Sequence, residues 1–178
     1  MVLRIILVLC VLGFFGCDSA RNEQYKELSA LRERIMEDNI NGLFGPAQRD
    51  LWIRFSQKAM AFYRAYPSDS SAPSLIFNAA ELYFKSNEGD SALMALTLLE
   101  EMPTFARKPE LLYLRGQVYQ MLFLNYDEAE ISYLAVVKSY PNHPKAQAAE
   151  TALSVLTTLN NTLEDSSALL KDSLLYQP

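Results

Sequence analysis

Helix-ending prolines recur along the chain at a nearly constant spacing. The prolines of Tyr66-Pro67, Met102-Pro103 and Tyr140-Pro141 are 36 and 38 residues apart. Proline lacks the backbone N–H that an α-helix uses and restricts the residue before it, so each pair predicts the end of a helix. A period of roughly 30–40 residues with helical spacing inside it is typical of stacked helix–turn–helix units. The sequence therefore predicts a repeating helical fold.

Three further landmarks recur in the same order in two units, which run from about Pro73 to Thr104 and from about Pro109 to Asn142. The equivalent pairs are Ala80 and Gly116, Tyr83 and Tyr119, and Ala92 and Ala129. Small residues allow a neighbouring helix to approach closely, and an aromatic residue three positions on lies over the same face. The first two pairs are 36 residues apart and the third is 37. The second unit must therefore accommodate one extra residue in the turn near Leu124-Asn125.

This order of small residue, aromatic residue and closing proline resembles the tetratricopeptide repeat (TPR). The resemblance implies an all-α fold, a short helix–turn–helix solenoid in which the first helix of each pair lines a concave binding side. We expect the TPR-like helical domain to span residues 25–160, with a helix from about Ala47 to Ala65 and a capping helix over 145–160. Whether residues 25–67 form a third unit stays open, as does the choice between a helix and a flexible tail for 161–178.

The amino terminus has the pattern of a signal peptide. Residues 5–15 (IILVLCVLGFF) are uninterrupted apolar or small residues, and Asp18 stops the run. As a helix this segment spans about 17 Å, against a hydrocarbon core of about 30 Å, so it is too short for a stable transmembrane helix. The pattern predicts a cleaved signal peptide over residues 1–16. A membrane anchor and a buried core helix are the alternatives.

Phe14-Phe15-Gly16-Cys17 resembles a bacterial lipobox, which implies that Cys17 carries acyl chains such as palmitate and that residues 17–24 form a lipidated tether. Cys10 is the weaker candidate because apolar residues flank it. A lipobox followed by TPR-like units is similar to periplasmic assembly lipoproteins of the BamD type. That similarity implies lipid anchoring at the bacterial cell envelope and favours the outer membrane, on its periplasmic or surface face. Asp18, however, resembles an inner-membrane retention signal.

Composition excludes several kinds of function. The net charge is −5, and −6 without residues 1–16, so the chain lacks the cationic surface that nucleic acid requires. Beyond Cys17 there is no cysteine, and His143 is the only histidine. We therefore expect no catalytic residues, no metal site and no cofactor, and conclude that the protein is not an enzyme. Asp127 and Glu128 open a predicted helix, where acidic side chains favour the helix dipole.

The predicted function is a membrane-anchored interaction scaffold that binds envelope proteins or peptides through the concave helical groove, with outer-membrane assembly as one setting. A glycan-binding or glycan-cleaving envelope lipoprotein is the alternative, with Phe77 and Tyr113 as exposed aromatics. A further reading places Phe77, Phe84 and Tyr113 in the core. Helical spacing predicts two partner-binding stripes, one per unit: Ser74, Phe77, Glu81, Phe84 and Lys85, and then Glu110, Tyr113, Gln117, Gln120 and Met121.

Overall fold

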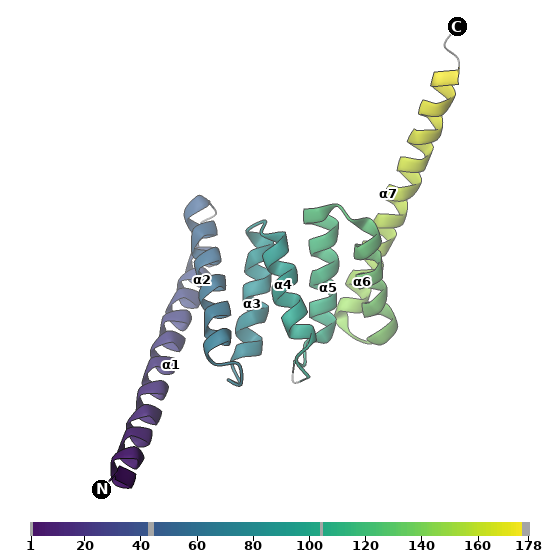
Figure 1. Ribbon diagram of the computed structural model, residues 1–178. Coiled ribbons are helices and arrows are strands. Elements are labelled where there is room, and N and C mark those ends of the chain that lie inside the picture. The colour runs from purple at the N-terminus through teal and green to yellow at the C-terminus, as the bar shows by residue number, and fades with distance from the viewer. Residues whose placement is uncertain (1, 43–44, 104, 176–178) are drawn as a thin grey trace. The chain divides into compact units, whose positions relative to one another are not determined.

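The protein is all-α. The computed structural model describes residues 2–42, 45–103 and 105–175, and the side chains of 19–42, 45–103 and 105–162. Within these residues there are seven α-helices, one π-helical turn and no β-strand, as predicted (Figure 1). The chain divides into two compact units, residues 1–102 and 103–178. Each unit is described by itself.

Unit one contains four helices that pack in chain order: α1 (Val2–Ile40), α2 (Pro46–Ala65), α3 (Ala72–Lys85) and α4 (Gly89–Glu100) (Figure 1). Helix α2 ends directly before Tyr66-Pro67 and α4 ends before Met102-Pro103, which confirms the helix ends predicted from the prolines. Prolines also lie in the first turns of α2 and α3, where their missing N–H breaks no helical hydrogen bond.

Helices α2 and α3 cross closely because small residues meet at the contact. Ser56 and Ala59 of α2 and Ala79 and Ala80 of α3 are all fully buried. The Ser56 hydroxyl donates to the backbone oxygen of Ala79 at 3.2 Å, which joins the two helices directly. The predicted packing role of Ala80 therefore agrees with its burial.

Helix α1 is continuous through residues 17–24, the stretch that the sequence predicts to be a lipidated tether. Within this stretch Arg21 pairs with Asp69 in the turn after α2, and the tether role stays a prediction. Cleavage after Gly16 and lipidation of Cys17 stay predictions, since the side chains of residues 1–18 lie outside the described ones. Among the described residues, no helix has the length and apolar character needed to cross a membrane.

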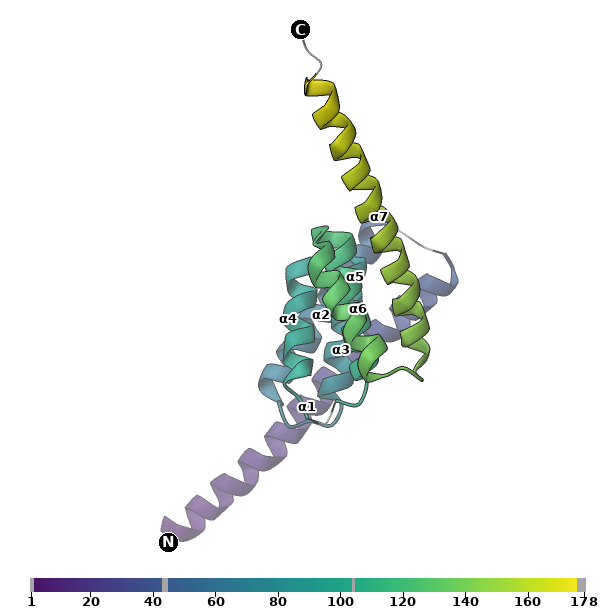
Figure 2. The same cartoon turned by 90° about the vertical axis from the view of Figure 1, so that its right-hand side faces the viewer.

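Unit two consists of α5 (Lys108–Val118), the π-helical turn η1 (Tyr119–Phe123), α6 (Tyr126–Ser139) and α7 (Pro144–Leu175). Helix α6 packs against both α5 and α7 (Figure 2). The core of this packing contains Ala129, Tyr133, Val136, Ala149 and Leu156. Helix α7 includes the predicted capping helix and continues through residues 161–175, so the tail is helical to Leu175.

The extra residue of the second unit is absorbed by η1. A π-helical turn holds one more residue per hydrogen-bonded loop than an α-helix. The N–H of Asn125 reaches back to the backbone oxygen of Tyr119 at 3.0 Å, and Leu124 adopts a left-handed conformation with φ 52°. In unit one the equivalent turn places Asn87 at φ 63°, two residues after the end of α3. The extra residue therefore lengthens the first helix of the second helix pair, and in both units a residue in the left-handed conformation follows the first helix.

Gly116 permits the close contact predicted for it. A Cβ atom at this position would lie 2.4 Å from Cε1 and 2.7 Å from Cδ1 of Tyr133. Tyr133 is only 1% exposed, so its ring has little room to move. The small residue in α5 is therefore matched to a large aromatic residue in α6.

Candidate partner-binding groove

A cavity of about 210 Å³ opens between α1 and α3 in unit one, with α2 beneath it. Each of the three helices contributes to its wall. The lining residues are Arg32, Ile35, Met36 and Asn39 of α1, Phe55 of α2, and Asn78, Glu81, Leu82 and Lys85 of α3. We call this cavity the α1–α3 groove.

The α1–α3 groove has an apolar floor and a polar rim. Ile35, Phe55 and Leu82 are buried, whereas Met36 on the rim is 56% exposed. The volume is below the roughly 300–1,000 Å³ of ordinary small-molecule pockets. It suits one or two apolar side chains presented by a protein segment.

The rim carries charges of both signs and two carboxamides. Arg32 and Lys85 are exposed cations, and Glu81 is a half-buried anion. The Asn39 side-chain oxygen accepts a hydrogen bond of 2.9 Å from Gln48 Nε2. Asn39 therefore presents its N–H donors, which can pair with a peptide carbonyl.

A larger depression of about 570 Å³ lies between α1 and α2, and it suits a partner less well. Its charged lining alternates in sign, with Arg34, Asp38, Asp50 and Arg54. Leu51 is its buried apolar residue, whereas the α1–α3 groove has three, Ile35, Phe55 and Leu82. We interpret this depression as solvated surface.

The five residues of the first predicted stripe differ in their burial and contacts. Glu81 and Lys85 line the α1–α3 groove, Ser74 is exposed, and Phe84 is half-buried. Phe77 is only 1% exposed and belongs to the core, so its assignment to the partner-binding surface was wrong. The helical spacing placed Phe77 near the stripe, but a large apolar side chain is more stable in the core than at a polar rim.

In the second predicted stripe, Tyr113 and Gln120 contact other helices of unit two. The Tyr113 ring lies 5.5 Å from that of Tyr133, and Lys145 Nζ lies 4.6 Å above the centre of the Tyr113 ring. Gln120 accepts a hydrogen bond of 2.8 Å from the Tyr133 hydroxyl. These contacts join α5 and η1 to α6 and α7. Tyr113 and Gln120 therefore support the packing of unit two, whatever they also contact.

The other residues of the second stripe differ in exposure. Glu110 is half-buried and pairs with Arg107 in the preceding turn at 3.3 Å. Gln117 is half-buried, and Met121 is 60% exposed. Their partner-binding role stays a prediction.

Residues on α1 were missed by the sequence analysis. The groove residues Arg32, Ile35, Met36 and Asn39 were left out because only α3 and α5 were treated as groove-lining helices. A signal was present, since Met36 and Ile40 are four residues apart and extend the apolar face of Ile35. They are 56% and 82% exposed, which is the feature that marks them as unpartnered apolar surface.

Ionisable side chains in unit two serve packing and capping. Burial raises the pKa of Tyr133, and the neighbouring Tyr113 raises it further, so its hydroxyl stays protonated and donates to Gln120. The side chain of Asn125 caps α6 by accepting from the N–H of Glu128 at 3.2 Å, and Asp127 and Glu128 occupy the first turn, as predicted. His143 Nδ1 accepts from the N–H of Lys145 at the start of α7.

No group of three or more histidine, cysteine or acidic side chains among the described residues has the arrangement of a metal site. Comparisons with protein-family models, curated proteins and solved structures found no match to this chain.

Proposed function

We propose that this protein is a lipid-anchored interaction protein of the bacterial cell envelope, and that the α1–α3 groove binds a segment of a partner protein. The observation that carries the proposal is the combination of a buried apolar floor, Ile35, Phe55 and Leu82, with a charged and carboxamide rim. Small apolar cavities inside a polar rim are where partner side chains bury the most area.

The partner segment we propose has a flexible or medium-sized apolar side chain at its centre. Met36 lies at the rim with 56% of its surface exposed, and methionine adapts its shape to different apolar partners. Ile40, one helical turn further along α1, extends the contact area. Asn39 and Asn78 then supply hydrogen bonds that set the register of the partner backbone, as carboxamides do for extended peptides.

The TPR-like interpretation is part of this proposal and is supported by two observations. In each unit a helix pair carries a small residue, Ala80 or Gly116, at a buried position in its first helix. In each unit the first helix ends at a left-handed residue, Asn87 or Leu124, before the second helix begins. We infer that the two pairs are repeats of one helix–turn–helix unit, and that α1 and α2 form a third.

The envelope location is proposed from the amino-terminal sequence. A short apolar run followed by Gly16-Cys17 predicts a lipidated mature chain that begins at Cys17. One protein carrying several acyl chains stays on a membrane, since each buried CH₂ contributes about 0.8 kcal/mol. Outer-membrane assembly is one setting for such a scaffold.

The two aromatic residues that supported the glycan-binding alternative, Phe77 and Tyr113, pack against other side chains. Phe77 is in the core, and Tyr113 packs between Tyr133 and Lys145. Neither ring is free to stack against a sugar, so we do not propose this function.

Site-specific photocrosslinking in the native envelope tests the groove. A photoreactive side chain at Met36 should crosslink to a discrete protein partner, and the same probe at Met94 serves as the control because Met94 is a methionine of unit one that is 46% exposed on α4. Lys85→Glu, at the groove rim, should weaken the Met36 crosslink. Equal crosslinking from both positions, or a Met36 crosslink indifferent to the charge at position 85, would contradict the proposal.

A further inference from the structure

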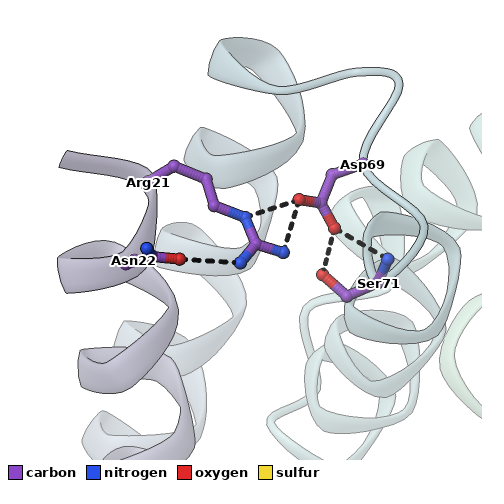
Figure 3. A network of polar contacts seen from close by, with 4 residues as sticks. All are labelled: Arg21, Asn22, Asp69 and Ser71. Carbon is purple, nitrogen blue, oxygen red and sulfur yellow. Dashed lines mark hydrogen bonds and ion pairs between the residues drawn. The ribbon is translucent and has the colours of Figure 1, made fainter. Parts of the chain in front are cut away.

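An ion pair joins Arg21 of α1 to Asp69 in the turn between α2 and α3. Arg21 Nε donates to Asp69 Oδ2 at 2.7 Å, and a second guanidinium nitrogen lies 2.6 Å from the same oxygen (Figure 3). The other carboxylate oxygen, Oδ1, accepts from the Ser71 hydroxyl at 2.5 Å and from the Ser71 N–H at 2.8 Å. Every oxygen of Asp69 is therefore held, and the Asp69 side chain is only 11% exposed.

Aromatic side chains enclose the cationic half of this ion pair. The Arg21 guanidinium carbon lies 5.2 Å from the ring centre of Tyr25 and 5.9 Å from that of Phe62. Phe62 is 1% exposed and lies 5.1 Å, between ring centres, from Tyr66. Cation–π contacts of this kind add to the ion pair where the cation is partly desolvated. We call Arg21, Asp69, Ser71 and the surrounding rings the amino-terminal lock.

The lock lies very close to the proposed lipidation site. Arg21 lies four positions after Cys17, and both residues belong to α1. A helical rise of 1.5 Å per residue gives a separation of about 6 Å along the axis. Once residues 1–16 are removed, Asp18 stands in the first turn of the helix, where an acidic residue stabilises the exposed N–H groups. The lipid and the folded unit are therefore joined by a helix of about one turn.

We propose that the α2–α3 turn, residues 66–71, lies against the lipid headgroups and holds unit one at a fixed distance and orientation on the membrane. This inference depends on the proposed lipidation of Cys17. A long flexible tether would let the unit rotate freely, whereas the amino-terminal lock fixes which end of α1 faces the bilayer. Asn41, directly after the end of α1 and 20 residues beyond Arg21, then lies about 30 Å further from the membrane.

The chemistry of this turn suits a headgroup surface. Its exposed residues, Pro67, Ser68 and Ser70, are uncharged and small. The negative charge of Asp69 is compensated by Arg21, so the turn does not repel anionic lipids. The turn has no large exposed apolar side chain that would insert deeply, so contact at the surface is what it permits.

Fluorescence quenching at the membrane surface tests the orientation. The mature chain has no cysteine other than Cys17, so Ser68→Cys and Asn41→Cys each provide a single labelling site in the acylated protein. Each labelled protein is reconstituted into phosphatidylethanolamine–phosphatidylglycerol vesicles with a headgroup-linked quencher. We expect the label at position 68 to lose most of its fluorescence and the label at position 41 to keep it.

Three variants identify the cause of that difference. Asp69→Ala breaks the lock, and ten glycine and serine residues inserted between Asp18 and Ser19 leave the lock intact but add a flexible reach of about 18 Å. Both should reduce the contrast between the two labels. Glu27→Ala is the matched control, since Glu27 of α1 pairs with Lys58 of α2 at 2.9 Å, away from the α2–α3 turn. It should leave the contrast unchanged.

Equal quenching of both labels in the acylated, vesicle-bound protein would overturn the fixed orientation, and so would stronger quenching at position 41. Retained contrast in the insertion variant would also overturn it, because the short connection to the lipid would then not be what orients the unit, and retained contrast in Asp69→Ala would exclude the lock as the cause. Absence of acylation or of vesicle binding would overturn the proposed lipid anchor itself, an outcome that the acyl mass and a flotation assay distinguish from a failure of orientation.

Discussion

Replacing Gly116 tests the packing of the second helix pair. In Gly116→Ala, the added methyl group would meet three ring atoms of Tyr133 at 2.4, 2.7 and 2.8 Å, all closer than real Cβ contacts. The ring cannot move outward, because Tyr133 is 1% exposed and its hydroxyl is hydrogen-bonded to Gln120. Overpacking of this kind costs about 1–3 kcal/mol, and three close contacts favour the upper part of that range.

A second effect acts in the opposite direction. Alanine is favoured over glycine inside a helix by about 1 kcal/mol. The net loss expected for Gly116→Ala is therefore about 1–2 kcal/mol. For a chain of this size that corresponds to a fall in Tm of about 2–8 °C. Urea and thermal unfolding followed by circular dichroism would measure both quantities on the purified protein.

The equivalent position of unit one supplies a compensating change. Ala80 corresponds to Gly116, and Leu96 corresponds to Tyr133, since the second helices are offset by 37 residues. Gly116→Ala combined with Tyr133→Leu recreates the pair found in unit one. The double variant should be more stable than the sum of the single losses predicts, by about 0.5–3 kcal/mol. Additive losses, or a Gly116→Ala variant that is stabilised by about 1 kcal/mol, would refute the close contact.

Three further substitutions have defined outcomes. Burial alone would raise the pKa of Asp69, but hydrogen bonds and the Arg21 cation lower it below the usual value. The contribution of Asp69 to stability is therefore present at neutral pH and is lost as pH falls below about 4. Asp69→Asn should lower the free energy of unfolding by about 1–3 kcal/mol at pH 7 and by less at pH 3, whereas Glu27→Gln, at a more exposed ion pair, should lower it by under about 1 kcal/mol at both pH values. Asn125→Ala removes the cap of α6 and should cost about 0.5–2 kcal/mol in urea unfolding, and an unchanged midpoint would contradict the capping role. Leu124→Gly relieves a left-handed residue that is 65% exposed and should stabilise by about 0.5–1 kcal/mol, a larger gain than Asn87→Gly, because asparagine tolerates this conformation better.

The helical fold could be predicted from sequence because its signals are local. Proline acts on the residues beside it, so Pro67, Pro103 and Pro141 marked the ends of α2, α4 and α6 without knowledge of any long-range contact. The extra residue near Leu124 was also visible, because the spacing of equivalent landmarks changes from 36 to 37 between Tyr119 and Ala129. Its conformation, a π-helical turn in which the Leu124 N–H donates to the Tyr119 oxygen, could not be predicted from spacing alone.

The site was predicted less well because burial is a long-range property. Phe77 and Glu81 are one helical turn apart on α3, yet Phe77 is in the core and Glu81 lines the groove. Which of them faces α1 depends on how α1 crosses α2, and the sequence of α3 holds no information about that. The same limit applies to Arg21, whose role depends on Asp69, a residue 48 positions later.

Intact mass spectrometry of the protein purified from its native membrane tests the proposed lipid anchor. We expect a chain that begins at Cys17, lacks residues 1–16 and carries the added mass of a diacylglyceryl group and acyl chains at its amino terminus. Cys17→Ser should abolish that added mass. A chain that begins at Met1, or a Cys17→Ser variant that keeps the lipid mass, would contradict the lipid anchor and with it the proposed place of this protein at the envelope.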